Sequence, residues 1–89
     1  MERILVKWAW SSEYGDSEGG EKTIDVPEGA SAEDKVLEFF RSPDFAYGDA
    51  GAHADGVCFN AYRASAFLFA GTYACHEIER ADGEIPLSL

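Results

Sequence analysis

The sequence predicts a small α+β domain in which one helix packs on an antiparallel sheet of four to five strands, in the chain order ββαββ. Three observations predict this class: two alternating segments near the N-terminus, one capped helical segment, and an aromatic, strand-like C-terminal third. The chain has 89 residues, of which 46% are hydrophobic. We therefore expect a single α+β domain, residues 1–89, with one hydrophobic core.

The first two segments alternate with the period of two that marks a half-buried strand. Within residues 3–10, one side carries Ile4, Val6, Trp8 and Trp10. Within residues 21–26, one side carries Lys22, Ile24 and Val26. Residues 11–20 between them have no aliphatic side chain, which is typical of a hairpin connection. The two segments are therefore predicted to pair, with both tryptophans in the core; an exposed stacking platform is the alternative for them.

A helix is predicted to begin at Ala32, because Ser31 and Asp34 have the spacing of a capping box. Acidic residues fill its first turn, and Arg41 closes the last turn with the charge that the helix dipole favours. Pro43 then ends it. The stripe expected to pack on the sheet consists of Ala32, Val36, Leu37 and Phe40.

The C-terminal third is predicted to form strands after a long loop, residues 42–56, that Phe45 and Tyr47 anchor. A strand extending as far as Glu79 is predicted from the shared parity of Phe67, Phe69, Tyr73 and Cys75. Its hairpin partner is indicated by Val57, Phe59 and Ala61. A helix over residues 61–70 is the competing interpretation, but the aromatic density favours strands. The alternation in residues 84–89 predicts an edge strand after the turn at Asp82-Gly83.

The reactive side chains do not indicate catalysis. Asp49, His53 and Asp55 could supply metal ligands, but aspartates in a glycine-rich loop are more often turn formers. Cys58 and Cys75 are expected to be free thiols in apolar surroundings, with a bridge across a hairpin as the alternative. Nucleophile, phosphate-loop and zinc-finger motifs are lacking. We expect a protein that is not an enzyme and that has no cofactor or metal.

Charge is the strongest functional signal. The chain has 17 acidic and 7 basic residues, a net charge of −10, which disfavours direct binding to nucleic acid or to an anionic membrane. An apolar run of the roughly 20 residues that span a membrane is lacking, and Met1-Glu2-Arg3-Ile4 does not begin a signal peptide. These features predict a cytoplasmic protein whose partner is a basic surface. The candidate binding residues are Asp16, Glu18, Glu21, Glu33, Asp34 and Glu38.

In size, charge and one-helix α+β layout, the chain resembles the small acidic inhibitors encoded by phages and mobile elements, including anti-CRISPR proteins and other DNA mimics. It also resembles bacteriocin immunity proteins. Neither resemblance rests on a matched motif, so neither assigns a role to a residue. The first resemblance implies an inhibitor that presents its acidic face to a basic partner, such as a nucleic-acid-binding protein; a bacteriocin-immunity-like protein is an alternative. A small homodimeric accessory or structural protein that buries the aromatic third in its own interface is the alternative.

Overall fold

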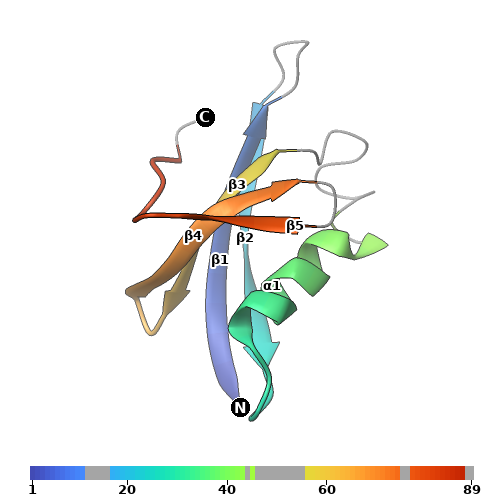
Figure 1. Cartoon of the computed structure of the whole chain (residues 1–89), viewed down its shortest axis with the longest axis vertical. Helices are drawn as coiled ribbons and strands as arrows, with labels where there is room; N and C mark the ends of the chain where they lie inside the picture. Colours follow the sequence, from blue (N-terminus) through green and yellow to red (C-terminus); the bar gives the residue numbers. More distant parts are fainter. Residues whose placement is uncertain (12–16, 44, 46–55, 75–76, 88–89) are drawn as a thin grey trace.

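The computed structural model describes residues 1–11, 17–43, 45, 56–74 and 77–87, with the backbone alone at residues 11, 17 and 18. These residues form one antiparallel sheet and one α-helix, which confirms the α+β class (Figure 1). The elements in chain order are β1 (Glu2–Ser11), β2 (Ser17–Val26), α1 (Ala32–Arg41), β3 (Val57–Arg63), β4 (Ala66–Ala74) and β5 (Glu77–Ala81). The chain order is that predicted, with the fifth strand added at the C-terminal end.

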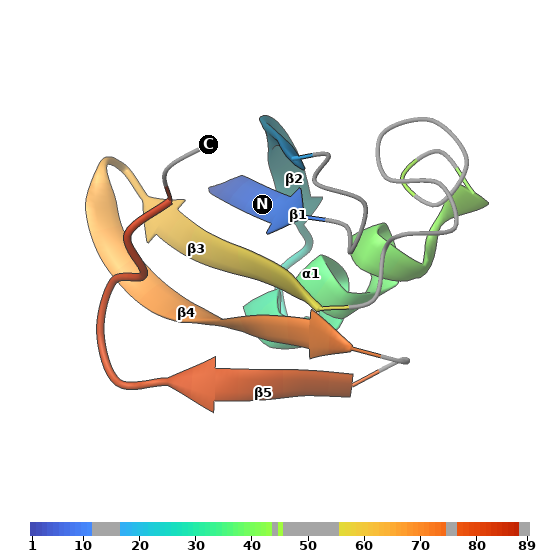
Figure 2. The ribbon, with the colours of Figure 1, turned by 90° about the horizontal axis from the view of Figure 1, so that it is seen from above.

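The five strands lie in the order β2-β1-β3-β4-β5, and every neighbouring pair is antiparallel. Figure 2 shows the sheet curving around α1, while the segment that follows β5 returns along the other face. We call the face that α1 covers the helix face and the opposite one the open face. The two faces have different compositions because side chains alternate along each strand.

The β1–β2 hairpin is longer than predicted, because β2 begins at Ser17 rather than at residue 21. The Trp8 indole accounts for the difference. Trp8 pairs with Gly20 across the hairpin, and a Cβ on Gly20 would lie 2.8 Å from Cζ2 of the indole. Glycine therefore lets β2 continue beneath the ring, where a side chain would collide with it.

Helix α1 has the predicted bounds and caps. The Ser31 hydroxyl accepts a hydrogen bond from the Asp34 amide at 3.4 Å, and at the other end the Ser42 amide donates to the Phe39 carbonyl oxygen at 3.0 Å. These contacts satisfy main-chain groups that a helix end leaves unpaired. Val36 and Phe40 are buried against the sheet, as the apolar stripe predicted.

Aromatic rings fill the space between α1 and the sheet. The Phe40 ring stacks on Tyr73 with centroids 5.4 Å apart and lies 5.0 Å from the Phe45 ring. Phe45 is fully buried, so it anchors the chain after α1 as predicted; Tyr47 lies outside the described residues. Trp8 and Trp10 are 5% and 8% exposed. Both tryptophans are therefore core residues, and the stacking-platform alternative is wrong.

Residues 61–70 belong to the β3–β4 hairpin and not to a helix. The strand predicted to reach Glu79 instead ends at Ala74, and Glu79 belongs to β5. The predicted parity of β4 is also wrong at Phe67, because the register shifts between Ala61 and Tyr62. This bulge leaves Leu68 opposite no residue of β3, which turns Phe67 onto the open face beside Tyr62. Phe67 is consequently 40% exposed instead of lying in the core.

The predicted edge strand over residues 84–89 is wrong, because β5 takes the edge position and residues 84–87 form no strand. Gly83 has φ +111°, a conformation that reverses the chain after β5. Pro86 has no N–H group to donate to a strand ladder. The segment instead crosses the open face as far as β3.

Candidate functional site

The six acidic residues predicted to bind a partner do not share one face. Glu33, Asp34 and Glu38 lie on α1 and are exposed. Glu21 lies on the open face, because it pairs with Lys7 across the β1–β2 hairpin. The remaining two, Asp16 and the side chain of Glu18, are outside the described part of the chain. The structure thus groups the three helical acids and separates Glu21 from them.

Ion pairs with arginine and lysine engage two of the helical acids. Glu33 pairs with Arg80 of β5, and Glu38 pairs with Lys35 at 3.3 Å. Elsewhere Arg63 reaches Glu2 at 2.6 Å and Arg3 reaches Asp25 at 3.6 Å. All four pairs are at least partly exposed, and water screens such contacts, so each stabilises the fold only modestly. The four pairs nevertheless neutralise the charges of four basic residues with carboxylates of the same chain.

Sequence reasoning missed a second acidic group at the C-terminal edge of the sheet. Glu77 and Glu79 lie on the open face of β5, since they pair with Ala74 and Thr72. Exposed carboxylates also follow β5 at Asp82 and Glu84. The signal was present in the sequence as the spacing of acids within residues 77–84. The predicted binding residues lie in or beside the β1–β2 connection and on the helix, so they do not include this group.

Asn60 lies on the open face of β3, the middle strand of the sheet. Asn60 is 2% exposed, although it points away from the hydrophobic core. Its side-chain amide donates to the Ile85 carbonyl oxygen and accepts from the Ile85 amide, each at 2.7 Å. A buried amide requires such partners, because losing water without replacing its hydrogen bonds is costly. The segment after β5 supplies these partners through its main chain.

Tyr62 provides a second contact to the same segment by donating its hydroxyl proton to the Glu84 carboxylate. This hydrogen bond raises the pKa of the Tyr62 phenol above its ordinary value of 10.0, and burial and the Glu84 charge add to the effect. The Lys7 ammonium lies 5.6 Å from the centre of the Tyr62 ring. These groups border an open cavity of about 410 Å³ between the sheet and residues 84–87.

The candidate metal ligands Asp49, His53 and Asp55 lie outside the described residues. Within the described ranges, no group of three or more His, Cys, Asp or Glu side chains could hold a metal ion. Cys58 is a free thiol on the open face, with its Sγ 3.8 Å from Thr72 Oγ1. Cys75 is outside the described residues.

Comparison with known proteins identifies no relative: no protein-family model, curated protein or solved structure matches the chain. In the part of the chain that the structure describes, no helix has both the length and the apolar character to cross a membrane. The functional argument therefore rests on the charges and contacts of this chain itself.

Proposed function

We propose that this chain is a small, acidic, non-enzymatic binding protein whose exposed carboxylates meet a basic site on a partner protein. The supporting observation is the charge that remains after internal pairing. Arg3, Lys35, Arg63 and Arg80 are each paired with a carboxylate of the same chain. Among the described carboxylates outside these pairs, Glu28 and Asp34 face solvent. Together with the net charge of −10, they favour attraction to a basic surface.

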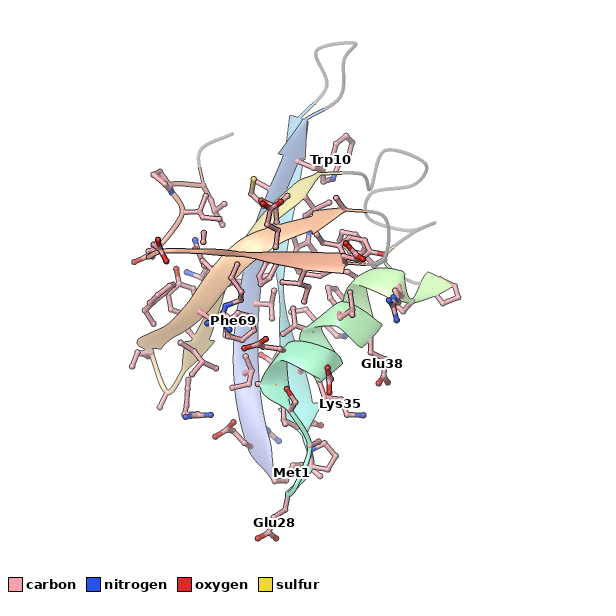
Figure 3. All side chains as sticks on the ribbon, viewed as in Figure 1. Met1, Trp10, Glu28, Lys35, Glu38 and Phe69 are labelled. Carbon is pink, nitrogen blue, oxygen red and sulfur yellow. The ribbon has the colours of Figure 1, made fainter. Side chains whose placement is uncertain are left out.

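The outer surface of α1 is the best candidate for the contact. Asp34 and Glu38 are one helical turn apart and both are exposed. Glu28, in the turn before the helix, is exposed as well, and Figure 3 shows Glu28 and Glu38 projecting away from the sheet. Glu38 retains most of its exposure, 72%, in its pair with Lys35. We call Glu28, Asp34 and Glu38 the α1 acidic surface.

A finer form of the proposal is that the partner is a cytoplasmic nucleic-acid-binding protein that the chain inhibits by imitating DNA. Duplex DNA carries one charge per roughly 1.7 Å of its axis, so ten charges correspond to about 17 Å of helix. A basic groove built for DNA would therefore recognise a comparable density of carboxylates. The net charge supports this form, as does the resemblance in size and layout to phage-encoded inhibitors.

The proposal is tested by capture on the immobilised chain from a cell lysate, at low and at high salt, with duplex DNA as competitor. We expect basic proteins to be retained at low salt and released by salt, because screening weakens contacts between exposed charges. Added DNA should displace those that carry a nucleic-acid site. Retention that does not change with salt would contradict the proposal.

Two variants with equal net charge locate the contact. Asp34→Asn/Glu38→Gln removes two carboxylates from the α1 acidic surface, whereas Glu77→Gln/Glu79→Gln removes two from β5. The first variant should lose most of the captured protein, and the second should resemble the wild type. Equal losses in both variants would show that net charge alone drives the binding and would overturn the assignment to α1.

A further inference from the structure

The segment after β5 is held on the open face chiefly through its main chain. Asn60 exchanges two hydrogen bonds with the amide and carbonyl groups of Ile85, both at 2.7 Å. Neighbouring strands in a sheet pair through the same main-chain amide and carbonyl groups. The Asn60 side chain therefore binds Ile85 as the edge of a strand would. The buried amide is thus a built receptor for an extended chain.

The side chains around this segment determine which amino-acid sequence can bind in its position. The Tyr62 hydroxyl donates to Glu84, and the cavity beside the segment is also bordered by Lys7, so an acidic residue is favoured at this position. Ile85 and Leu87 are each half-buried. The site therefore matches a segment that has, in this order, an acidic residue, an aliphatic residue, a proline and a second aliphatic residue.

The packing around the segment is open. A cavity of about 410 Å³ lies between residues 84–87 and the sheet, so close apolar packing does not lock the segment in place. Its connection to β5 is short and runs through Gly83 at φ +111°. A Cβ built on Gly83 would meet no atom within 4 Å, so the constraint at this position is the backbone conformation alone. Such an element opens locally more readily than the core does.

We propose that the open face binds residues 84–87 of a second copy of this chain in place of its own, so that two copies associate by reciprocal exchange of their C-terminal segments. A second copy is the occupant that the contacts specify, because it carries the sequence that already fits Asn60 and Tyr62. Exchange replaces each intramolecular contact with an identical intermolecular one, so only the hinge at Asp82-Gly83 must change. This inference does not depend on the acidic binding function.

The conformation of Gly83 provides the test. Gly83→Ala strains the closed chain, because residues with a Cβ rarely adopt φ +111°, whereas an extended hinge accommodates alanine. We expect light scattering to give twice the monomer mass for this variant at concentrations where the wild type is monomeric. Gly29→Ala is the matched control: Gly29 also has positive φ, +87°, and open space around it, but lies in the turn before α1. That variant should remain a monomer.

Combining Gly83→Ala with Asn60→Ala removes the receptor amide and should restore the monomer. A monomeric Gly83→Ala protein would overturn the proposal, as would a dimer that survives the Asn60 substitution.

A second measurement covers the case in which Gly83→Ala does not fold. Ile85→Pro in the full chain removes the donor to Asn60 and weakens the chain's own segment.

A synthetic peptide of residues 84–89 is then titrated into the Ile85→Pro protein and followed by NMR at the Asn60 side-chain amide. Saturable shifts that disappear with Asn60→Ala are expected. An effective concentration in the millimolar range is typical of a short tether, so the untethered peptide should bind the variant far better than the wild type. The absence of saturable shifts in Ile85→Pro would refute the exchange site.

Discussion

The side-chain amide of Asn60 and the main chain of Ile85 exchange two hydrogen bonds of 2.7 Å across 25 positions of sequence. This relationship buries a polar side chain on the face of the sheet that α1 leaves uncovered. It also holds residues 84–87, which form no strand, against β3. The C-terminal segment is therefore part of the folded domain rather than an appended tail.

Asn60→Ala should lower the free energy of unfolding by about 1–3 kcal/mol, because it removes both hydrogen bonds. The amide of Ile85 should also lose protection from hydrogen exchange. Urea denaturation and exchange measured by NMR check the two effects. Asn60→Asp is the control, since its carboxylate still accepts from the Ile85 amide but cannot donate to the carbonyl. Unchanged exchange at Ile85 in the alanine variant would contradict the prediction.

The Tyr62–Glu84 contact should break at alkaline pH. The contact raises the pKa of the phenol above 10.0, so its stabilising effect is complete below pH 10.0 and is lost as the pH rises through the raised pKa. Glu84→Gln removes the carboxylate charge and should move the phenolate titration of Tyr62 to lower pH. Absorbance titrations measure this, with Tyr62→Phe identifying the signal of that residue. An identical titration in wild type and Glu84→Gln would exclude the contact in solution.

Local sequence patterns predicted those elements whose structure depends on interactions between residues close in the sequence. The alternation from Ile4 to Trp10 identified the core face of β1, because strand side chains alternate regardless of their partners. Ser31 located the start of α1 because its hydroxyl caps an amide three residues away. The shift in register at Tyr62 was not predictable in the same way. It depends on how two strands pair, which periodicity within one strand does not reveal.

The candidate site was less predictable than the fold because its contacts span long stretches of sequence. Glu33 was identified as an exposed helical acid, but its pair with Arg80 joins residues 47 positions apart. Asn60 gave no sequence signal, because a lone asparagine in an aromatic strand has no motif. Its role follows only from the return of Ile85 over β3. Charge counting predicted the sign of the surface but not how its acids are divided among the faces.

The β3–β4 turn should be improvable by substitution. Ala64 and Ser65 have φ of +49° and +71°, the conformation of a two-residue hairpin turn that favours Asn-Gly. Ala64→Asn/Ser65→Gly should stabilise the protein by about 1 kcal/mol, because each native residue holds a left-handed conformation at a cost. Thermal unfolding measures the gain. A loss of stability would indicate that the turn has a different conformation in solution.

Gly71→Ala should strongly destabilise the sheet. A Cβ on Gly71 would lie 2.4 Å from the Glu79 carbonyl oxygen, so β4 and β5 would have to separate. We expect a loss of about 2 kcal/mol or more, in the range of overpacked sites. Gly29→Ala is the comparison, because a Cβ there meets nothing within 4 Å and costs only backbone strain. The prediction fails if the two variants unfold at the same urea concentration.

Phe45→Ala should cost about 3–5 kcal/mol, as for a phenylalanine in a closely packed core. Its ring is fully buried and lies between 5.0 and 5.5 Å from the rings of Phe40, Phe39 and Trp8. Phe67→Ala makes the same chemical change at a side chain that is 40% exposed, and it should cost far less. Chemical denaturation of both variants measures the difference. Similar costs would mean that Phe45 does not anchor the chain after α1.

Arg80 should link β5 to α1 only weakly. Its guanidinium lies 5.0 Å from the centre of the Phe69 ring and pairs with Glu33. Both charged side chains are about half exposed, at 52% and 48%, so water screens their attraction. A double-mutant cycle of Arg80→Ala and Glu33→Ala should therefore give a coupling energy below about 1 kcal/mol, diminished further by salt.

Arg80→Lys separates the two contacts of Arg80. Lysine keeps the positive charge but lacks the planar group that lies over the Phe69 ring. If the ring contact contributes most, the lysine variant should be destabilised nearly as much as the alanine variant, by about 0.5–1 kcal/mol. Unfolding in urea at low and high salt distinguishes the contributions, because only the ion pair depends strongly on ionic strength. A coupling above about 2 kcal/mol between Arg80 and Glu33 would instead require a pair shielded from water, contrary to their exposure.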